Sequence, residues 1–182
     1  MIQIRIHGRG GQGVVTAAEL IAMAAFYQGR ESQAFPSFGV ERTGAPIEAF
    51  VRISDRPIRT REHVYQPDVL IIQDPTLLNT IDVVRGAKKD TKLIINTNQA
   101  RESIKINLSK DNLFTVDATA IALKIIGKNL VNTVILGAFA KVTGLVSLTS
   151  LEKAIKEKFC DKGTDIIDKN IVAIKQAYNY EK

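Results

Sequence analysis

The sequence is poor in residues that hold metals or disulfides, with one cysteine, two histidines and no tryptophan among 182 residues. A single cysteine forms no disulfide within the chain and cannot hold a cysteine-ligated iron–sulfur cluster. Cys160, His7 and His63 together are too few for a structural zinc site of the usual Cys/His kind. We therefore expect a reduced, cytoplasmic setting and no metal bound by this chain.

Long apolar runs are also missing. No run reaches the roughly 18 residues of a membrane span, and the N-terminus lacks the charged-then-apolar layout of a signal peptide. Apolar residues make up 45% of the chain and charged residues 24%, which are ordinary values for a globular protein. The composition predicts a folded protein with no membrane association.

The net charge of +6 is unevenly distributed along the chain. All ten arginines precede residue 102, and all fifteen lysines follow residue 87. A basic tail can bind nucleic acid through phosphate contacts. Here the tail lysines fall between apolar positions such as Leu151, Ile155 and Phe159, a pattern typical of a solvated helix face. We expect no nucleic-acid partner.

Hydrophobic periodicity predicts strands alternating with helices. Strands are expected at 1–7, 31–35, 47–54, 68–74, 92–96 and 112–117, and helices at 13–28, 74–84, 118–126, 131–142, 149–159 and around 167–178. Asp74-Pro75 predicts the start of the second helix, and a capping box from Thr149 to Glu152 predicts the start of the fifth. The prediction is one domain over 1–182, with a three-layer α/β/α fold, a largely parallel, possibly mixed sheet and a helical C-terminal third.

A glycine-rich loop lies between the first strand and the first helix. Gly8, Gly10 and Gly13 fit the pattern G-x-G-x-x-G, in which glycines let the backbone approach a phosphate at a helix N-terminus. Val14-Val15 follow where a P-loop needs Lys-Ser/Thr, which disfavours nucleotide triphosphate hydrolysis. The loop predicts a phosphate cradle, and a tight crossover without a ligand remains the alternative.

A nicotinamide or flavin dinucleotide site also needs an acidic residue at the end of the second strand. Glu31 begins that segment, and the strand runs on to Phe35-Pro36 with no carboxylate at its end. The sequence therefore predicts a pyrophosphate cradle without the acidic partner residue for NAD. A stand-alone dinucleotide-dependent oxidoreductase remains an alternative function.

The segment 35–46, FPSFGVERTGAP, is the second marked loop. It is longer than an ordinary connection and contains prolines, glycines, aromatics and charges, a combination typical of functional loops. Arg42 can bind a carboxylate or a phosphate through its two-pronged guanidinium. A structural loop whose Phe side chains fill the core is the alternative.

Three stretches, HGRGGQGVVTAAE, QAFPSFGVERTGAPIEAFVRIS and DVLIIQDPTLL, resemble the gamma subunit of 2-oxoacid:ferredoxin oxidoreductases, most of all the pyruvate branch. The resemblance implies a complex that converts pyruvate, CoA and oxidised ferredoxin to acetyl-CoA, CO2 and reduced ferredoxin. Thiamine diphosphate and iron–sulfur clusters are then expected in alpha, beta and delta partner subunits, with this chain inactive alone. The 2-oxoglutarate and 2-oxoisovalerate branches remain alternatives.

The resemblance also implies site residues, and none of them is catalytic. The residues expected to bind coenzyme A are Gly8, Gly10, Gly11, Gln12, Gly13 and Val14, with Ser37 and Asn96 as weaker candidates. The residues expected to contact partner subunits are Phe38, Glu41, Arg42 and Thr43.

Overall fold

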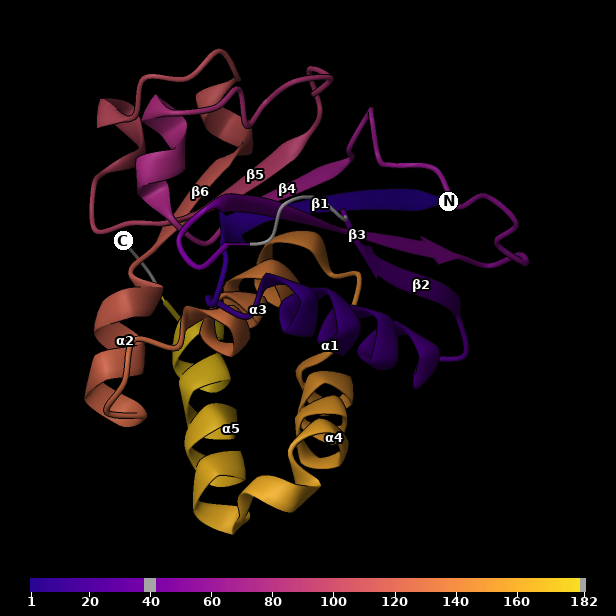
Figure 1. Cartoon of the computed structure of the whole chain (residues 1–182), viewed down its shortest axis with the longest axis vertical. Helices are drawn as coiled ribbons and strands as arrows, with labels where there is room; N and C mark the ends of the chain where they lie inside the picture. Colours follow the sequence, from indigo (N-terminus) through magenta and orange to yellow (C-terminus); the bar gives the residue numbers. More distant parts are fainter. Residues whose placement is uncertain (38–41, 181–182) are drawn as a thin grey trace.

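A mixed six-stranded sheet forms the centre of the computed structural model, which describes residues 1–37 and 42–180 (Figure 1). The strand order is β2-β3-β1-β4-β5-β6. β3 runs antiparallel to both of its neighbours, and β1, β4, β5 and β6 are mutually parallel. The strands are β1 (Ile2–Arg9), β2 (Glu31–Pro36), β3 (Pro46–Ser54), β4 (Val69–Ile72), β5 (Lys92–Asn96) and β6 (Leu113–Val116).

The α-helices of the described chain cover one face of this sheet (Figure 1). They are α1 (Val14–Phe26), α2 (Ala118–Ile125), α3 (Val131–Thr143), α4 (Leu148–Lys158) and α5 (Thr164–Tyr178). None of the described helices is long and apolar enough to cross a bilayer. The predicted α/β fold with a mixed sheet and a helical C-terminal third is confirmed.

The second face of the sheet is covered by coil from the segment 55–67 and by coil and short 3-10 helices from the segment 75–112. A smaller apolar cluster joins this layer to β4, β5 and β6 through residues such as Leu77, Val83 and Ile104. The third layer of the fold is therefore present, but within the described residues it contains no α-helix.

Two polar side chains of β1 are buried under this coil layer. Ile4 and Ile6 point toward the helices, so Arg5 and His7 point to the opposite face, where they are 1% and 0% exposed. The Arg5 guanidinium donates to His7 Nε2 and to the backbone oxygens of Val64, Val83 and Arg85. Arg5 thereby fixes the coil layer to the central strand.

The helix predicted at 74–84 is wrong beyond its first turn. Asp74 does cap it, accepting from Thr76 N, but only a 3-10 helix forms, Pro75–Asn79. The next residues include β-branched Ile81, Val83 and Val84, which disfavour a helix. The Val83 oxygen accepts from Arg5 instead of continuing a helical ladder.

The predicted capping box at Thr149 is also wrong, because the cap of α4 lies two residues earlier. Ser147 is the cap, and its hydroxyl accepts from Ser150 N. The Gln28 side chain, which follows α1, accepts from Ser147 N and from the Ser150 hydroxyl. The acceptor that completes this cap comes from a distant segment, so local spacing did not reveal it.

The buried His7 predicts a pH dependence of stability. Burial, with the charges of Arg5 and Arg85, lowers the pKa of His7 from 6.5 to about 3. Below pH 6.5 His7 is therefore protonated in the unfolded chain but stays neutral in the folded chain. The free energy of unfolding then falls as the pH drops toward 3. Urea unfolding between pH 6.5 and 5 should show a loss of up to ~1.4 kcal/mol per pH unit.

The matched variant is His7→Gln, which keeps an acceptor for Arg5 Nε and does not titrate. It should lower stability at pH 7 but flatten the slope between pH 6.5 and 5. The same slope in both proteins would show that His7 does not cause the pH dependence.

Candidate functional site

The glycine loop makes a tight turn from β1 into α1. Gln12 N donates to Arg9 O at 3.0 Å, and Gly13 adopts a left-handed φ of 69° immediately before the helix. No side chain caps α1, and the first helical bond is Ala17 N to Gly13 O. The N–H groups of the first turn therefore have no acceptor in the helix and carry its partial positive charge, an arrangement that favours an anion.

The segment 42–45 lies directly against this loop. Gly10 N donates to Ala45 O at 2.9 Å, and Gly44 N donates to Gly10 O at 3.0 Å. A Cβ atom on Gly10 would be 2.4 Å from the backbone oxygen of Arg42, far inside contact distance. Glycine at position 10 is therefore required so that the two loops can meet.

A cavity of 450 Å³ lies between the two loops, within the rough size range of small-molecule sites. Its lining residues are Gly10, Gly11, Gly13, Val14, Val15, Arg42, Thr43 and Ile47. The fold thus brings together predicted residues from both marked loops, with Arg42 and Thr43 exposed beside the first turn of α1. Phe38 and Glu41 lie outside the described residues.

Gln12 has a structural role in the loop. Its side-chain oxygen accepts from Arg9 N at 2.8 Å, and its Nε2 donates to Asp74 at 2.9 Å. Arg9 also donates to Asp74 at 3.1 Å and to Gly44 O at 3.0 Å. The Gln12 amide is therefore engaged in a clamp that joins the glycine loop, the 42–45 segment and the end of β4.

Asp74 is the acceptor at the centre of this clamp. Burial favours a higher pKa for its carboxyl group, but hydrogen bonds from Thr76 and Gln12 and the charge of Arg9 outweigh burial and lower that pKa. Asp74 therefore stays ionised, and each carboxylate oxygen accepts two hydrogen bonds.

The two weaker predicted residues lie outside the cavity. The Asn96 amide donates to Gln73 O and to the Thr119 hydroxyl, both at 2.9 Å, and its oxygen accepts from Thr119 N at 3.1 Å. Asn96 thereby connects β4, β5 and the start of α2. Ser37 is half-buried, and its backbone N–H donates to Glu48 O.

Sequence reasoning missed two amide side chains near the glycine loop. Both polar atoms of the Gln73 side chain are buried without a partner, and Gln73 Oε1 is 3.3 Å from the position of a Cβ atom on Gly8. Asn132 Nδ2 lies 2.5 Å from the position that a Cβ atom on Gly13 would take. A glutamine inside the apolar run DVLIIQD was a usable signal, but nothing local marked Asn132.

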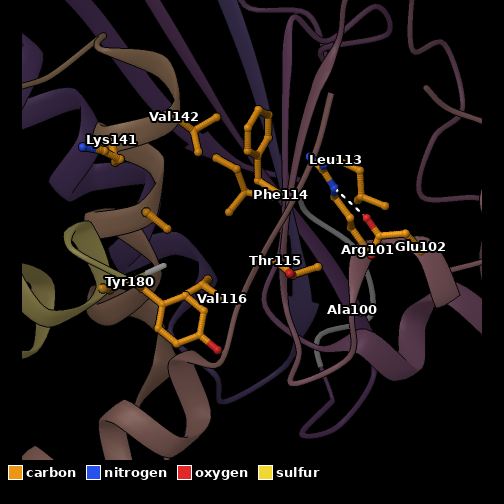
Figure 2. Close-up of a pocket in the computed structure, with 13 residues that line it drawn as sticks. Ala100, Arg101, Glu102, Leu113, Phe114, Thr115, Val116, Lys141, Val142 and Tyr180 are labelled. Atoms are coloured by element: carbon orange, nitrogen blue, oxygen red, sulfur yellow. Dashed lines mark hydrogen bonds and ion pairs between the residues drawn. The ribbon is translucent and has the colours of Figure 1, made fainter. Parts of the chain in front are cut away.

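A larger cavity, of 590 Å³, lies along the edge strand β6 (Figure 2). Its lining is mostly apolar, and the charged pair at its side, Arg101 and Glu102, is already joined at 3.0 Å. His7 and Gln73, whose buried side-chain atoms lack a hydrogen bond within the described chain, do not line this larger cavity. We therefore take the smaller cavity at the glycine loop as the candidate site.

Comparisons with known proteins agree on one family. The family model described as pyruvate ferredoxin/flavodoxin oxidoreductase matches residues 3–180. The chain is 51% identical to the pyruvate/ketoisovalerate oxidoreductases common subunit gamma of Thermococcus kodakarensis, over 98% of this chain and 96% of that one. It is 56% identical to the pyruvate synthase subunit PorC of Methanosarcina barkeri, over 86% and 85% of the two chains.

A solved structure indicates the same family. The pyruvate oxidoreductase subunit PORC of Thermotoga maritima superposes with a TM-score of 0.82 at 39% identity, covering 97% of this chain and 94% of that one.

The clamp around Asp74 predicts the effect of a substitution. Asp74→Asn exchanges one acceptor oxygen for a donor, which breaks the bonds from Arg9 and Gln12 or those from Thr76. The free energy of unfolding should fall by about 1–3 kcal/mol in urea titrations. The control is Asp55→Asn, because Asp55 pairs with Arg30 at 3.0 Å but is 84% exposed, and it should cost less than about 1 kcal/mol. If both variants lost the same free energy of unfolding, the hydrogen bonds around Asp74 would contribute no more to stability than an exposed ion pair does.

Proposed function

The chain belongs to the pyruvate ferredoxin/flavodoxin oxidoreductase family, and from this we propose that it is the gamma subunit of a pyruvate:ferredoxin oxidoreductase and binds coenzyme A at its glycine loop. The relatives from Thermococcus kodakarensis and Methanosarcina barkeri support the first part, because their names are those of a gamma subunit and of PorC, and the match covers most of each chain. The complex would convert pyruvate, CoA and oxidised ferredoxin to acetyl-CoA, CO2 and reduced ferredoxin.

The redox chemistry belongs, in this proposal, to the alpha, beta and delta partners. One cysteine cannot ligate an iron–sulfur cluster. Cys160 is exposed and follows α4, far from the glycine loop in sequence. The described residues contain no cluster of metal-ligating side chains. Thiamine diphosphate and the iron–sulfur clusters would therefore be held by partner subunits, and this chain would contribute to substrate binding and assembly.

The observation that carries the CoA proposal is the uncapped first turn of α1 beside Arg42 across one cavity. The free N–H groups and the helix dipole favour a dianionic or more highly charged group. Arg42 adds a planar donor fork that suits phosphate oxygens. Coenzyme A offers a diphosphate and a 3′-phosphate to these donors.

The strand order argues against the stand-alone dinucleotide oxidoreductase. In a dinucleotide fold the second strand lies next to the first, so that its final carboxylate reaches the ribose. Here β3 lies between β1 and β2, and β2 ends at Pro36 without a carboxylate. A thermal shift with NAD(H) or NADP(H) but none with coenzyme A would favour that alternative.

A shared role across 2-oxoacids is the second candidate. The Thermococcus kodakarensis relative is named as a subunit common to pyruvate and ketoisovalerate oxidoreductases. If this chain likewise serves several 2-oxoacids, then substrate choice lies in the partner subunits. Activity with pyruvate, 2-oxoisovalerate and 2-oxoglutarate, measured on complexes purified through this chain, distinguishes the two cases.

Assembly is tested by affinity purification from the native cell, followed by identification of the bound chains. We expect alpha, beta and delta subunits to co-purify with this chain. A chain that is active alone, or that never associates with such partners, would overturn the proposal.

Arg42→Ala tests the CoA site. In the purified complex the KM for coenzyme A should rise about tenfold or more, because a charge-assisted hydrogen bond is worth about 1.5–3 kcal/mol. The melting temperature should hardly change, since Arg42 is exposed. Arg59→Ala removes another exposed arginine, outside the cavity, and should leave both values unchanged. A fall in melting temperature without a change in KM would make Arg42 structural.

A further inference from the structure

The sheet has an open edge at β6, since no strand of the described residues lies on its far side. Val116 O accepts from Thr97 N at 2.9 Å, so the backbone groups of Val116 point toward β5, and by alternation so do those of Phe114. The backbone groups of Leu113 and Thr115 therefore point to the open edge. The Leu113 N–H donates to the turn before β6, but the Thr115 N–H and oxygen have no neighbouring strand to bond within the described residues.

β6 also lacks the residues that usually protect an edge strand. Charged side chains and proline hinder the addition of another strand to an edge. The opposite edge strand, β2, begins with Glu31 and ends with Pro36, whereas β6 is Leu-Phe-Thr-Val, with neither a charge nor a proline. Its length of four residues is the one protective feature that β6 has. β6 is therefore the edge at which an extended peptide could join the sheet.

The 590 Å³ cavity follows this edge around both faces of the sheet. On the helix side it is lined by residues of α3 and α5, among them Val142 and Ala177. On the coil side it is lined by Arg101 and Glu102. Figure 2 shows the side chains of β6 between Val142 on one side and the Arg101–Glu102 pair on the other. An occupant that fills this cavity must extend to both sides of the sheet, as the alternating side chains of a strand do.

Hydrogen bonds hold both walls of the cavity in place. On the helix side, Lys92 Nζ of β5 donates to Val142 O near the end of α3 at 2.9 Å. On the coil side, Lys110 Nζ donates to Arg101 O at 3.1 Å and also to Ile104 O. The walls are therefore ordered before a strand enters, which lowers the entropic cost of binding.

The chemistry of the two walls selects the occupant. The helix wall is apolar, whereas Arg101 and Glu102 on the coil wall are at least half exposed. A small apolar ligand would leave the backbone groups of Thr115 unpaired. Two copies of this chain would repel each other here, because the chain has a net charge of +6 and both Arg101 and Lys141 line the cavity.

We propose that β6 accepts an extended strand of a partner subunit, in which apolar residues alternate with polar, mainly acidic ones. The apolar side chains would pack against α3 and α5, the acidic ones would lie on the coil side near Arg101, and the partner backbone would bond the Thr115 N–H and oxygen. This inference rests on the proposed assembly with partner subunits and identifies a place on this chain where one of them binds.

The first test is Thr115→Pro, with affinity purification of the complex through this chain. Proline removes the N–H that points to the open edge, and it leaves the hydrogen bonds from Phe114 and Val116 to β5 in place. The yield of at least one partner subunit should fall at least tenfold. An unchanged yield of every partner would overturn the role of β6.

The matched control is Ala34→Pro on the other edge strand. Ser37 N donates to Glu48 O, so the alternation along β2 points the N–H of Ala34 away from β3. This variant should leave the yield of every partner unchanged. An equal loss of partners in both variants would mean that proline acts through stability and would overturn the specific role of β6.

The second test needs no variant and decides the question if Thr115→Pro does not fold. Amide hydrogen exchange is compared between the free chain and the purified complex. The Thr115 amide should exchange at least tenfold more slowly in the complex, because it gains a partner there. The Phe114 and Val116 amides already bond β5 in the free chain. Equal exchange of the Thr115 amide in both samples would overturn the proposal.

The third test identifies the occupant. A photoreactive phenylalanine analogue at position 102, on the exposed coil wall, should cross-link to a segment of a partner subunit in which apolar and acidic residues alternate. Cross-linking to a second copy of this chain would overturn the proposed occupant.

These outcomes separate this inference from the proposed function. If the unmodified chain purifies without any partner subunit, the proposed assembly fails. If partners purify equally well with the unmodified chain and with Thr115→Pro, and the Thr115 amide exchanges equally fast in both samples, only the role of β6 fails.

Discussion

The candidate site depends on the absence of two side chains. A Cβ atom at position 10 would meet the Arg42 backbone at 2.4 Å, and one at position 13 would meet the Asn132 amide at 2.5 Å. The first contact is with backbone and cannot be relieved cheaply, and at position 13 the left-handed φ of 69° also disfavours any other residue. The glycine loop is therefore the point at which β1, the 42–45 segment and α3 come together. Hydrogen bonds from Arg9 and Gln12 to Asp74 stabilise this arrangement.

On the other face of β1, a buried polar side chain determines the path of the coil layer. Arg5 is buried on β1, where its donors are satisfied by backbone oxygens from 64, 83 and 85, far away in sequence. A buried guanidinium without those acceptors would be strongly unfavourable, so the coil must follow the path that supplies them. β1 thus leads into the glycine loop at its end and contains, within the strand, the residue that fixes the coil layer.

The sequence predicted what periodicity and local chemistry determine. The strands and the helices α1, α3 and α5 follow from apolar spacing, and the resemblance of both marked loops identified the family. The errors have tertiary causes: Arg5 takes an oxygen in the 75–84 segment, and Gln28 completes the cap of α4. Gln73 was missed because its significance comes from what lies beside it, and a sequence does not record an unpaired buried amide.

The antiparallel strand β3 distinguishes the surroundings of this glycine loop from those in a dinucleotide fold. Inserted between β1 and β2, it separates the end of β2 from the glycine loop, so a carboxylate there would no longer lie beside the ribose of a bound dinucleotide. Because β3 runs antiparallel to β1, its first residue, Pro46, pairs with Arg9 and thus lies at the loop end of β1. The residues just before it, 42–45, are thereby placed against the glycine loop. One inserted strand therefore removes the position used to recognise NAD in dinucleotide folds and brings Arg42 to the glycine loop.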